Sequence, residues 1–407
     1  MEVTVKGKTK VELAGKRVGT TIWVRNVPVL AVKNFSCIKN LTVEFRRIVV
    51  FIGEQASGKS VTCKLYYFFT QALRKVAMSC LREERNVEDF HKRLMSEFCA
   101  IFPETAWIQD AFSINWKVGA RRISASHKRG DKTIKLNIYD YRDSYVRALE
   151  ECRAASHVVS DGREDFEGSW RYDRLVGKVV ADEFSDVSVD YVPAGRAFFS
   201  TIQHVIFSLL TSNVDIDYFL KEFGQKLEVF RRLGYPRTDD VGKRAFFEKL
   251  CRQILHGKYH YDGKDQWIIT DKNHKIRLAD SSSGQQEALP LLMVLAMQAT
   301  LSRRRGGVNR VLVEEPEAHL YPTAQQNIVD AIGRILQTVG SVGCIITTHS
   351  PFILCCLNNV LKRESGLRSF VSACHLHDGV GDNIYDAELG LINAERFDDI
   401  SIEIANA

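Results

Sequence analysis

Residues 47–60 read Arg47-Ile48-Val49-Val50-Phe51-Ile52-Gly53-Glu54-Gln55-Ala56-Ser57-Gly58-Lys59-Ser60. The first part is a short apolar, β-branched run, which is typical of a buried parallel strand. The last eight residues have the form G-x-x-x-x-G-K-[ST] of a phosphate-binding loop. The segment from Lys59 through Val76 is predicted to be a helix, so the loop lies between a strand and a helix. We therefore expect its backbone N–H groups to face a nucleotide phosphate chain.

This loop predicts binding of ATP together with Mg²⁺. Lys59 is expected to reach the β- and γ-phosphates, and the hydroxyl of Ser60 is expected to bind the metal. The predicted ATP-binding residues are Gly53, Glu54, Gln55, Ala56, Ser57, Gly58, Lys59, Ser60 and Val61. A surface Gly/Ser turn before a helix is the alternative, and the buried strand in front of the loop argues against it.

Two adjacent carboxylates follow a second apolar strand, Asn309 through Val313. Parallel strands deliver such residues to the carboxyl edge of a sheet, where ligands collect. Glu314 is expected to hold the Mg²⁺ shell through water. Glu315 is the candidate general base, or water-positioning residue, for attack on the γ-phosphate. The alternative is an acidic first turn of a helix, which the strand and the spacing to a later histidine disfavour.

That histidine is His349, directly after the apolar strand predicted for residues 343–348. A helix from about Thr323 to Thr338 joins the two strands, so the segment is predicted to be a right-handed βαβ unit. A histidine before Ser350-Pro351 is often only a turn residue. Next to the other motifs, His349 is instead expected to contact the γ-phosphate as a catalytic residue.

A serine-rich segment, residues 281–287, precedes an apolar helix predicted from Ala288 to Leu301. Its hydroxyl and backbone donors at a helix start form an anion site of the helix N-terminal type. The residues concerned are Ser282, Ser283, Gly284 and Gln285. A Ser-rich linker is the alternative, and the helix that follows argues against it.

In this order the four segments resemble the P-loop, signature, Walker B and switch-histidine motifs of an ABC-type ATPase head. The resemblance implies an α/β fold with a P-loop core, an antiparallel β subdomain and an inserted helical lobe. It also implies a homodimer in which the signature of one copy caps the γ-phosphate held by the other. The signature departs from the Leu-Ser-Gly-Gly-Gln of transporters, as it does in RecF, SMC, Rad50 and OLD relatives.

Five parts are expected along the chain. They are a β-like extension (1–28), a P-loop core with the β subdomain (29–197), a helical lobe (198–280), the signature, Walker B and histidine half of the core (281–357) and a C-terminal segment (358–407). Within the subdomain we expect a helix at 87–102 and a hairpin of strands 111–124 and 133–139. Arg196, at the junction with the lobe, is proposed to couple the ATP state to lobe position, with Gln203 following it.

Three sequence segments resemble those of OLD/RecF-like ATPases and indicate the subfamily. They lie at residues 191–196, 314–322 and 347–352. No sustained heptads precede the signature, so a long coiled-coil arm is not expected. The tail after His349, with Asp398-Asp399 as its acidic pair, is too short for the TOPRIM nuclease of OLD proteins.

The chain thus resembles stand-alone ATPases of antiphage systems, which act as scaffold or sensor for a separately encoded nuclease or toxin. A RecF-like DNA clamp and a nucleotide-locked, non-enzymatic scaffold are the alternatives. A transporter subunit is disfavoured by the long insert.

Composition points to a reducing compartment and leaves the partner open. Ten cysteines include no pair with zinc-binding spacing, so reduced thiols and a cytoplasmic location are expected. The longest apolar stretch is too short to cross a bilayer. A net charge of +6 permits contact with nucleic acid without requiring it. The basic clusters are Arg121-Arg122, Lys128-Arg129 with Lys132, and Arg303-Arg304-Arg305.

Overall fold

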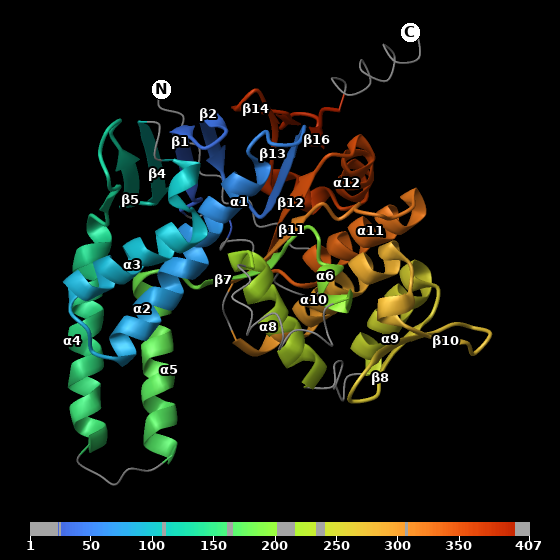
Figure 1. Cartoon of the computed structure of the whole chain (residues 1–407), viewed down its shortest axis with the longest axis horizontal. Coiled ribbons are helices and arrows are strands. Elements are labelled where there is room, and N and C mark those ends of the chain that lie inside the picture. Colours follow the sequence, from blue (N-terminus) through green and yellow to red (C-terminus); the bar gives the residue numbers. More distant parts are fainter. Residues whose placement is uncertain are drawn as a thin grey trace, which may run out of the picture.

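The computed structural model describes residues 23, 26–107, 111–160, 166–201, 216–232, 241–305 and 308–394 (Figure 1). Eleven of its strands form one sheet. They are β1 (Val29–Phe35), β2 (Ile38–Glu44), β3 (Ile48–Gly53), β4 (Phe112–Val118), β5 (Arg121–His127), β6 (Lys135–Asn137), β7 (Val187–Val192), β11 (Val308–Glu314), β12 (Val342–Thr348), β13 (Val371–His377) and β14 (Val380–Asn383). Their order is β6-β5-β4-β1-β2-β14-β13-β3-β12-β11-β7.

The sheet has a parallel half and an antiparallel half. Strands β7, β11, β12, β3 and β13 run parallel, and every residue of β3 is buried. Strands β2, β1, β4, β5 and β6 are antiparallel, and β14 joins the halves. This arrangement confirms the predicted α/β P-loop fold with an antiparallel β subdomain.

Helices pack on both faces of this sheet. One hydrophobic core includes residues of α1 (Lys59–Tyr67), α2 (Leu73–Arg82) and α3 (Val87–Ile101). The other includes residues of α8 (Tyr218–Arg232), α9 (Val241–Leu250), α10 (Ser283–Arg305), α11 (Pro322–Thr338) and α12 (Pro351–Arg363). The strands β8 (Lys258–Tyr261), β9 (Gln266–Ile269) and β10 (Lys275–Arg277) form a separate antiparallel sheet within the part expected to be a helical lobe.

The helix after the P-loop is interrupted, whereas the sequence predicted one continuous helix to Val76. A π-helical turn, η2 (Phe68–Ala72), separates α1 from α2. Phe68 and Phe69 are both buried, against Phe98 and Trp116 respectively. A π turn changes the direction of successive side chains, and here both neighbouring phenylalanines reach the core.

The predicted strand 111–124 is wrong, because it contains a hairpin of its own. Strand β4 ends at Val118 and β5 begins at Arg121. Between them Gly119 has a φ of 59°, a left-handed backbone conformation that glycine adopts without strain. The chain turns again at residues 128–131, where the Asp131 N–H donates to the Lys128 carbonyl oxygen.

Two long helices, α4 (Asp140–Ser160) and α5 (Phe166–Glu183), were not predicted. Figure 1 shows them side by side as an arm that projects away from the sheet. At their base they join the core through side chains such as Tyr145 and Val180. Ion pairs of Arg82 with Asp173 and of Arg153 with Glu84 also tie them to α2 and the turn after it. The arm is therefore built onto the β subdomain.

The boundary expected at residue 357 does not separate a C-terminal segment from the core, because β13 pairs with β3 in the centre of the sheet. Most of the N-terminal extension, Gln203 and Asp398-Asp399 lie outside the described residues. Within the described residues, no helix is both long and apolar enough to cross a membrane.

Close packing of β12 against the start of β3 gives a stability prediction. A Cβ added to Gly343 would lie 2.6 Å from the Arg47 carbonyl oxygen and 2.6 Å from the Trp23 ring. Gly343→Ala should therefore destabilise the protein by about 1–3 kcal/mol. Gly366 has no atom within 4 Å of such a Cβ, so Gly366→Ala is the matched control. Equal thermal melting temperatures for the two variants would contradict this packing.

Candidate nucleotide site

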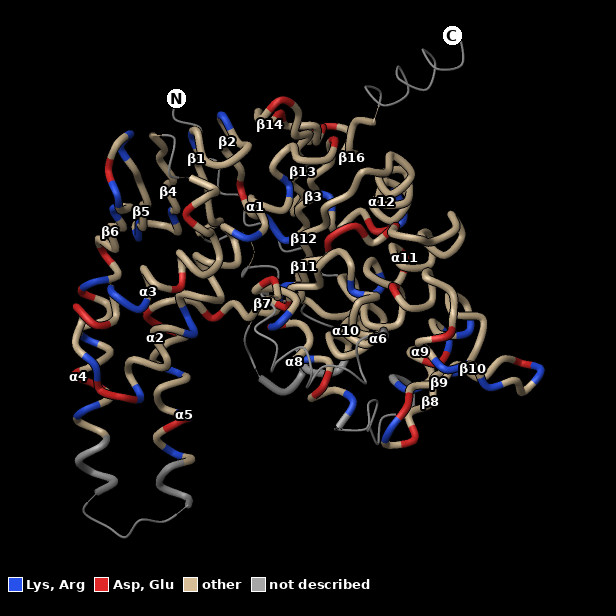
Figure 2. Tube along the Cα trace, viewed as in Figure 1, with Lys and Arg blue, Asp and Glu red and all other residues tan. Residues whose placement is uncertain are grey.

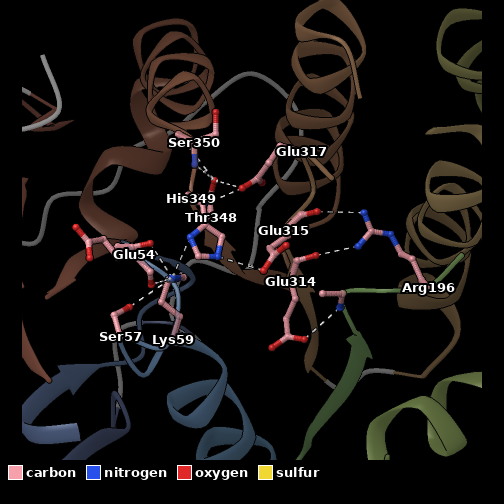
Figure 3. Close-up of polar contacts among 12 residues, drawn as sticks. Glu54, Ser57, Lys59, Arg196, Glu314, Glu315, Glu317, Thr348, His349 and Ser350 are labelled. Atoms are coloured by element: carbon pink, nitrogen blue, oxygen red, sulfur yellow. Dashed lines mark hydrogen bonds and ion pairs between the residues drawn. The ribbon is translucent and has the colours of Figure 1, made fainter. Parts of the chain in front are cut away.

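The site lies at the carboxyl ends of β3, β11 and β12, where the P-loop, Walker B and histidine motifs meet (Figure 3). Lys59 begins α1 and is 5% exposed. Its ammonium group donates to the carbonyl oxygens of Gly53 at 2.7 Å and Glu54 at 2.6 Å. Burial lowers the pKa of Lys59, while the Glu315 and Glu317 carboxylates oppose that shift. The lysine thus stands inside the loop with carboxylates facing it.

Glycine is required at both ends of the loop. Gly58 has a φ of 106°, and its added Cβ would lie 2.6 Å from Ile38. Gly53 has a φ of 155°, and an added Cβ would lie 2.0 Å from the Leu376 carbonyl oxygen. The loop is therefore held between β13 and the turn that joins β1 to β2. This framing shapes a phosphate cradle at the start of α1.

His349 connects the P-loop lysine with Glu315. Its Nδ1 lies 3.4 Å from Lys59 Nζ, and its Nε2 lies 3.2 Å from Glu315 Oε1. Because an ammonium group can only donate, Nδ1 must accept there and Nε2 carries the proton that Glu315 accepts. The structure therefore brings together the lysine, the histidine and the expected catalytic carboxylate, which follow three separate strands.

Glu314 is buried beside Glu315 and points to the other side. Its two oxygens accept from the Tyr191 hydroxyl at 2.8 Å and from the Ala194 N–H at 3.2 Å. Burial and the nearby Glu314 raise the pKa of Tyr191 well above its usual value, so the phenol remains a donor. With both oxygens engaged, Glu314 suits a metal contact through water.

The oxygen donors here fit Mg²⁺. The described residues hold no cluster of three or more His, Cys, Asp or Glu side chains suited to a metal ion. Mg²⁺ at nucleotide sites needs only one or two protein ligands, because it keeps waters and binds substrate phosphates. Ser60, exposed at the start of α1, and Glu314 are the residues that would hold it.

Glu317 is a site residue that the sequence analysis missed. One oxygen of its carboxylate accepts from the His349 N–H at 2.8 Å and from the Thr348 hydroxyl at 2.7 Å. It therefore fixes the turn that carries His349 (Figure 3). The signal was present in the Glu-Glu-Pro-Glu phrase, but its role depends on a contact with β12 that spacing alone does not reveal.

Arg196 is fully buried and contacts both the end of β11 and the start of α10. Its guanidinium donates to the carbonyl oxygens of Glu314 at 2.9 Å and Glu315 at 3.1 Å. On its other side Nε lies 2.9 Å from the Glu287 carbonyl oxygen and 3.3 Å from a Glu287 carboxylate oxygen. Burial lowers the pKa of Arg196, and Glu287 most strongly opposes that shift. The arginine thus joins the Walker B turn to the first turns of α10.

The signature residues lie at the start of α10, the helix that Arg196 joins to the Walker B turn. The Ser282 hydroxyl donates to Gln285 Oε1 at 3.1 Å, and Gln285 Nε2 donates to the Leu255 carbonyl oxygen at 2.6 Å. Gly284 is packed so that a Cβ would lie 2.6 Å from the His319 carbonyl oxygen. Within the described residues, no hydrogen bond joins Ser282, Ser283 or Gln285 to the P-loop.

Comparisons with known proteins agree with an ATPase site. Residues 197–354 match the AAA ATPase domain family. A stretch of 90 residues is 33% identical to the "Retron Ec83 probable ATPase" of Escherichia coli. That stretch is 21% of this chain and 16% of the relative, so the chain matches only a small part of that protein's length.

Solved structures of similar shape are distant in sequence. The SMC head domain from Thermotoga maritima has a TM-score of 0.40 and 11% identity, covering 89% of this chain and 98% of that one. The recombination mediator protein RecF, bound to ATPrS, has a TM-score of 0.36 and 13% identity, covering 88% of this chain and 99% of that one. Since both scores are low, the fold assignment stands on strand order and motif positions.

Two neighbouring carboxylates are predicted to give different defects. Glu315→Gln removes the proposed base and should lower ATP hydrolysis by about 100-fold or more while ATP still binds. Glu314→Gln should instead raise the Mg²⁺ concentration needed for half-maximal activity. Steady-state ATPase assays across a Mg²⁺ titration distinguish the two. Wild-type hydrolysis by Glu315→Gln would show that another group is the catalytic carboxylate.

Arg196 is predicted to act as a positioning residue. Arg196→Lys keeps the charge but cannot span Glu287 and both Walker B carbonyls, so kcat should fall about 10- to 100-fold with KM within a few-fold. Arg310→Lys is the control, because Arg310 is also buried on β11 but packs over Trp23 and Tyr66 away from the turn. If kcat falls by the same factor in both variants, the role of Arg196 is only structural.

Proposed function

We propose that this chain is an ABC-type ATPase of the SMC/RecF-like group, which closes as a dimer around ATP and hydrolyses it slowly. We further propose that it serves as sensor and scaffold for a separately encoded nuclease or toxin in antiphage defence. The observation that carries the enzymatic part is the line from Lys59 through His349 to Glu315, held within hydrogen-bond distance.

Hydrolysis follows from the chemistry of these residues. Mg²⁺, which Ser60 and Glu314 would hold, would neutralise negative charge on the phosphates. The Glu315 carboxylate accepts a proton from, or orients, the attacking water. His349 donates to Glu315 through Nε2, which fixes the carboxylate and leaves its second oxygen for the water. Lys59 exchanges its loop carbonyls for phosphate oxygens and stabilises the negative charge there.

The dimer is supported by the position of the signature residues. Within the described residues, none of Ser282, Ser283 and Gln285 is hydrogen-bonded to the P-loop of its own copy. Ser282 and Ser283 are exposed at a helix start, where they could donate to a phosphate. The link from Glu315 through Arg196 to Glu287 joins the catalytic turn of a copy to its own signature. In a composite dimer each signature serves the partner's ATP, so this link would connect the two sites.

The effector partnership rests on the resemblance to stand-alone antiphage ATPases and on the stretch of 90 residues that is 33% identical to the retron Ec83 probable ATPase. The same head would also serve a RecF-like clamp that holds DNA when ATP closes the dimer. A nucleotide-locked scaffold without significant turnover is the non-enzymatic alternative. Co-purification from the native host, followed by mass spectrometry, separates them. A nuclease or toxin would support the defence role, and repair proteins alone would favour the clamp.

The composite site has a direct test by mixing inactive variants. Lys59→Ala should lose ATP binding, and Ser282→Glu should repel the partner's γ-phosphate. Each protein alone should be inactive. An equal mixture should recover about a quarter of wild-type activity, because half of the dimers are mixed and each has one intact site. Two results would contradict the composite site, namely no recovery and hydrolysis by a species that remains monomeric in light scattering.

A further inference from the structure

The central sheet is open between β2 and β13. The strand between them, β14, pairs with β13 from Cys374, opposite Asn383, onwards, and it pairs with β2 only at Asn40. Beyond these pairs the two neighbouring strands border a cavity of about 650 Å³. Its walls include residues 42–44 of β2 and 371–374 of β13. We call this cavity the sheet cleft.

Backbone groups of β2 point into the sheet cleft. The Asn40 N–H donates to the Gly379 carbonyl oxygen, on the side away from β1. Because backbone groups of an antiparallel strand alternate in direction, the N–H groups of Thr42 and Glu44 point to that same side. On the other wall, Val371 precedes the first residue of β13 that pairs with β14. Buried backbone donors and acceptors require partners, and an added strand would supply them.

One side of the sheet cleft is apolar. Val43, Val49 and Cys374 line it, and all three belong to the hydrophobic core that includes α1, α2 and α3. Successive side chains of a strand point to opposite faces. A strand in the cleft would therefore cover this side if every second residue were apolar.

The other side of the sheet cleft carries two arginines. Arg46 donates to Glu44 Oε2 at 3.0 Å and to the Ser369 carbonyl oxygen at 3.3 Å, so it reaches from the end of β2 towards β13. Arg368 donates to two carbonyl oxygens at the end of α12 and forms no ion pair with a described carboxylate. The lining also includes Glu388, which is exposed. An acidic side chain on this side of an added strand would pair with Arg368.

The described chain ends near the sheet cleft. The Ala373 carbonyl oxygen accepts from the Ile384 N–H at 3.0 Å, and the Ile384 carbonyl oxygen accepts from the Asn393 N–H at 2.7 Å. Asn393 therefore lies about two strand spacings, or about 10 Å, from β13. In Figure 1 and Figure 2, β14 and β16 (Leu391–Ile392) lie near one another, just before the described chain ends at Ala394.

The C-terminal sequence has the pattern that the sheet cleft requires. Residues 400–404 read Ile400-Ser401-Ile402-Glu403-Ile404. Strict alternation of apolar and polar residues is typical of a strand with one buried face, and isoleucine is enriched in strands. These residues lie outside the described part of the chain. The six residues from Ala394 to Ile400 can span up to about 20 Å, so the segment can reach the cleft of its own copy.

We propose that residues 400–404 bind in the sheet cleft of their own copy as an added strand along β2. Their backbone pairs with the free edge of β2, as in other cases of strand addition. The three isoleucines cover the apolar side, and Glu403 lies on the side of Arg46 and Arg368. The added strand joins the two halves of the sheet at a place outside the nucleotide site.

Two variants of the full chain place the same charge on opposite sides of this strand. Ile402→Asp puts a carboxylate on the apolar side, and the control Ser401→Asp puts one on the side of the arginines. Hydrogen–deuterium exchange of the segment that contains Thr42 and Glu44 is measured by mass spectrometry. Ile402→Asp should raise its exchange rate about tenfold or more, and Ser401→Asp should stay within about twofold of wild type. Equal exchange in wild type and both variants, or equal increases in the two variants, would overturn the proposal.

A labelled peptide of residues 397–407 gives a second test by fluorescence anisotropy. It should bind the Ile402→Asp chain about tenfold or more tightly than wild type, whose cleft is already filled. Calorimetry with ATP checks that the variant folds, and Ile402→Ser replaces Ile402→Asp if the latter does not bind ATP. The proposal is overturned if the peptide binds wild type as tightly as the variant, or binds neither.

Dilution tests whether the strand comes from the same copy. Slow exchange of the Thr42–Glu44 segment in wild type should persist over a dilution of about 100-fold, because a contact within one chain does not depend on concentration. Loss of this protection as the copies separate in light scattering would overturn the assignment to the same copy.

Discussion

A single buried guanidinium fixes the candidate nucleotide site to the helix that carries the signature residues. Arg196 lies between the end of β11 and the start of α10, with none of its side chain exposed. A charge in that position is costly unless it is paired and hydrogen-bonded. Glu287 pairs it, and the carbonyl oxygens of Glu314 and Glu315 complete its contacts. The desolvated pair therefore favours one fixed relation between the Walker B turn and the signature helix.

The same contact explains a strained residue. Glu315 has a φ of 45°, a left-handed backbone conformation that residues other than glycine adopt at a cost of about 1–3 kcal/mol. The Arg196 bond to its carbonyl and the bond from its N–H to the Thr347 carbonyl oppose relaxation. The turn aims the carboxylate at His349 rather than along the strand. Strain of this kind is common where a reacting group must be preorganised.

Sequence reasoning predicted the parts of the fold that depend on local pattern. Buried β-branched runs predicted β3 and β12, and Pro322 at the first turn of α11 agrees with the helix predicted between β11 and β12. The α4–α5 arm was missed because its helices mix aromatic, small and charged residues, so no clear apolar stripe stands out. Glu317 and Glu287 were missed as site residues because their partners lie far away in the chain. Such contacts become visible only after the strands are placed side by side.

The central claim is that one active site is built from two copies of this chain. The most direct measurement is a cryo-EM structure of the Glu315→Gln variant with ATP and Mg²⁺. The account predicts a dimer with two ATP molecules, each bound by Lys59 of one protomer and within hydrogen-bond distance of Ser282 or Ser283 of its partner. ATP held in a monomer, or in a dimer whose signature helices lie away from the γ-phosphates, would contradict it.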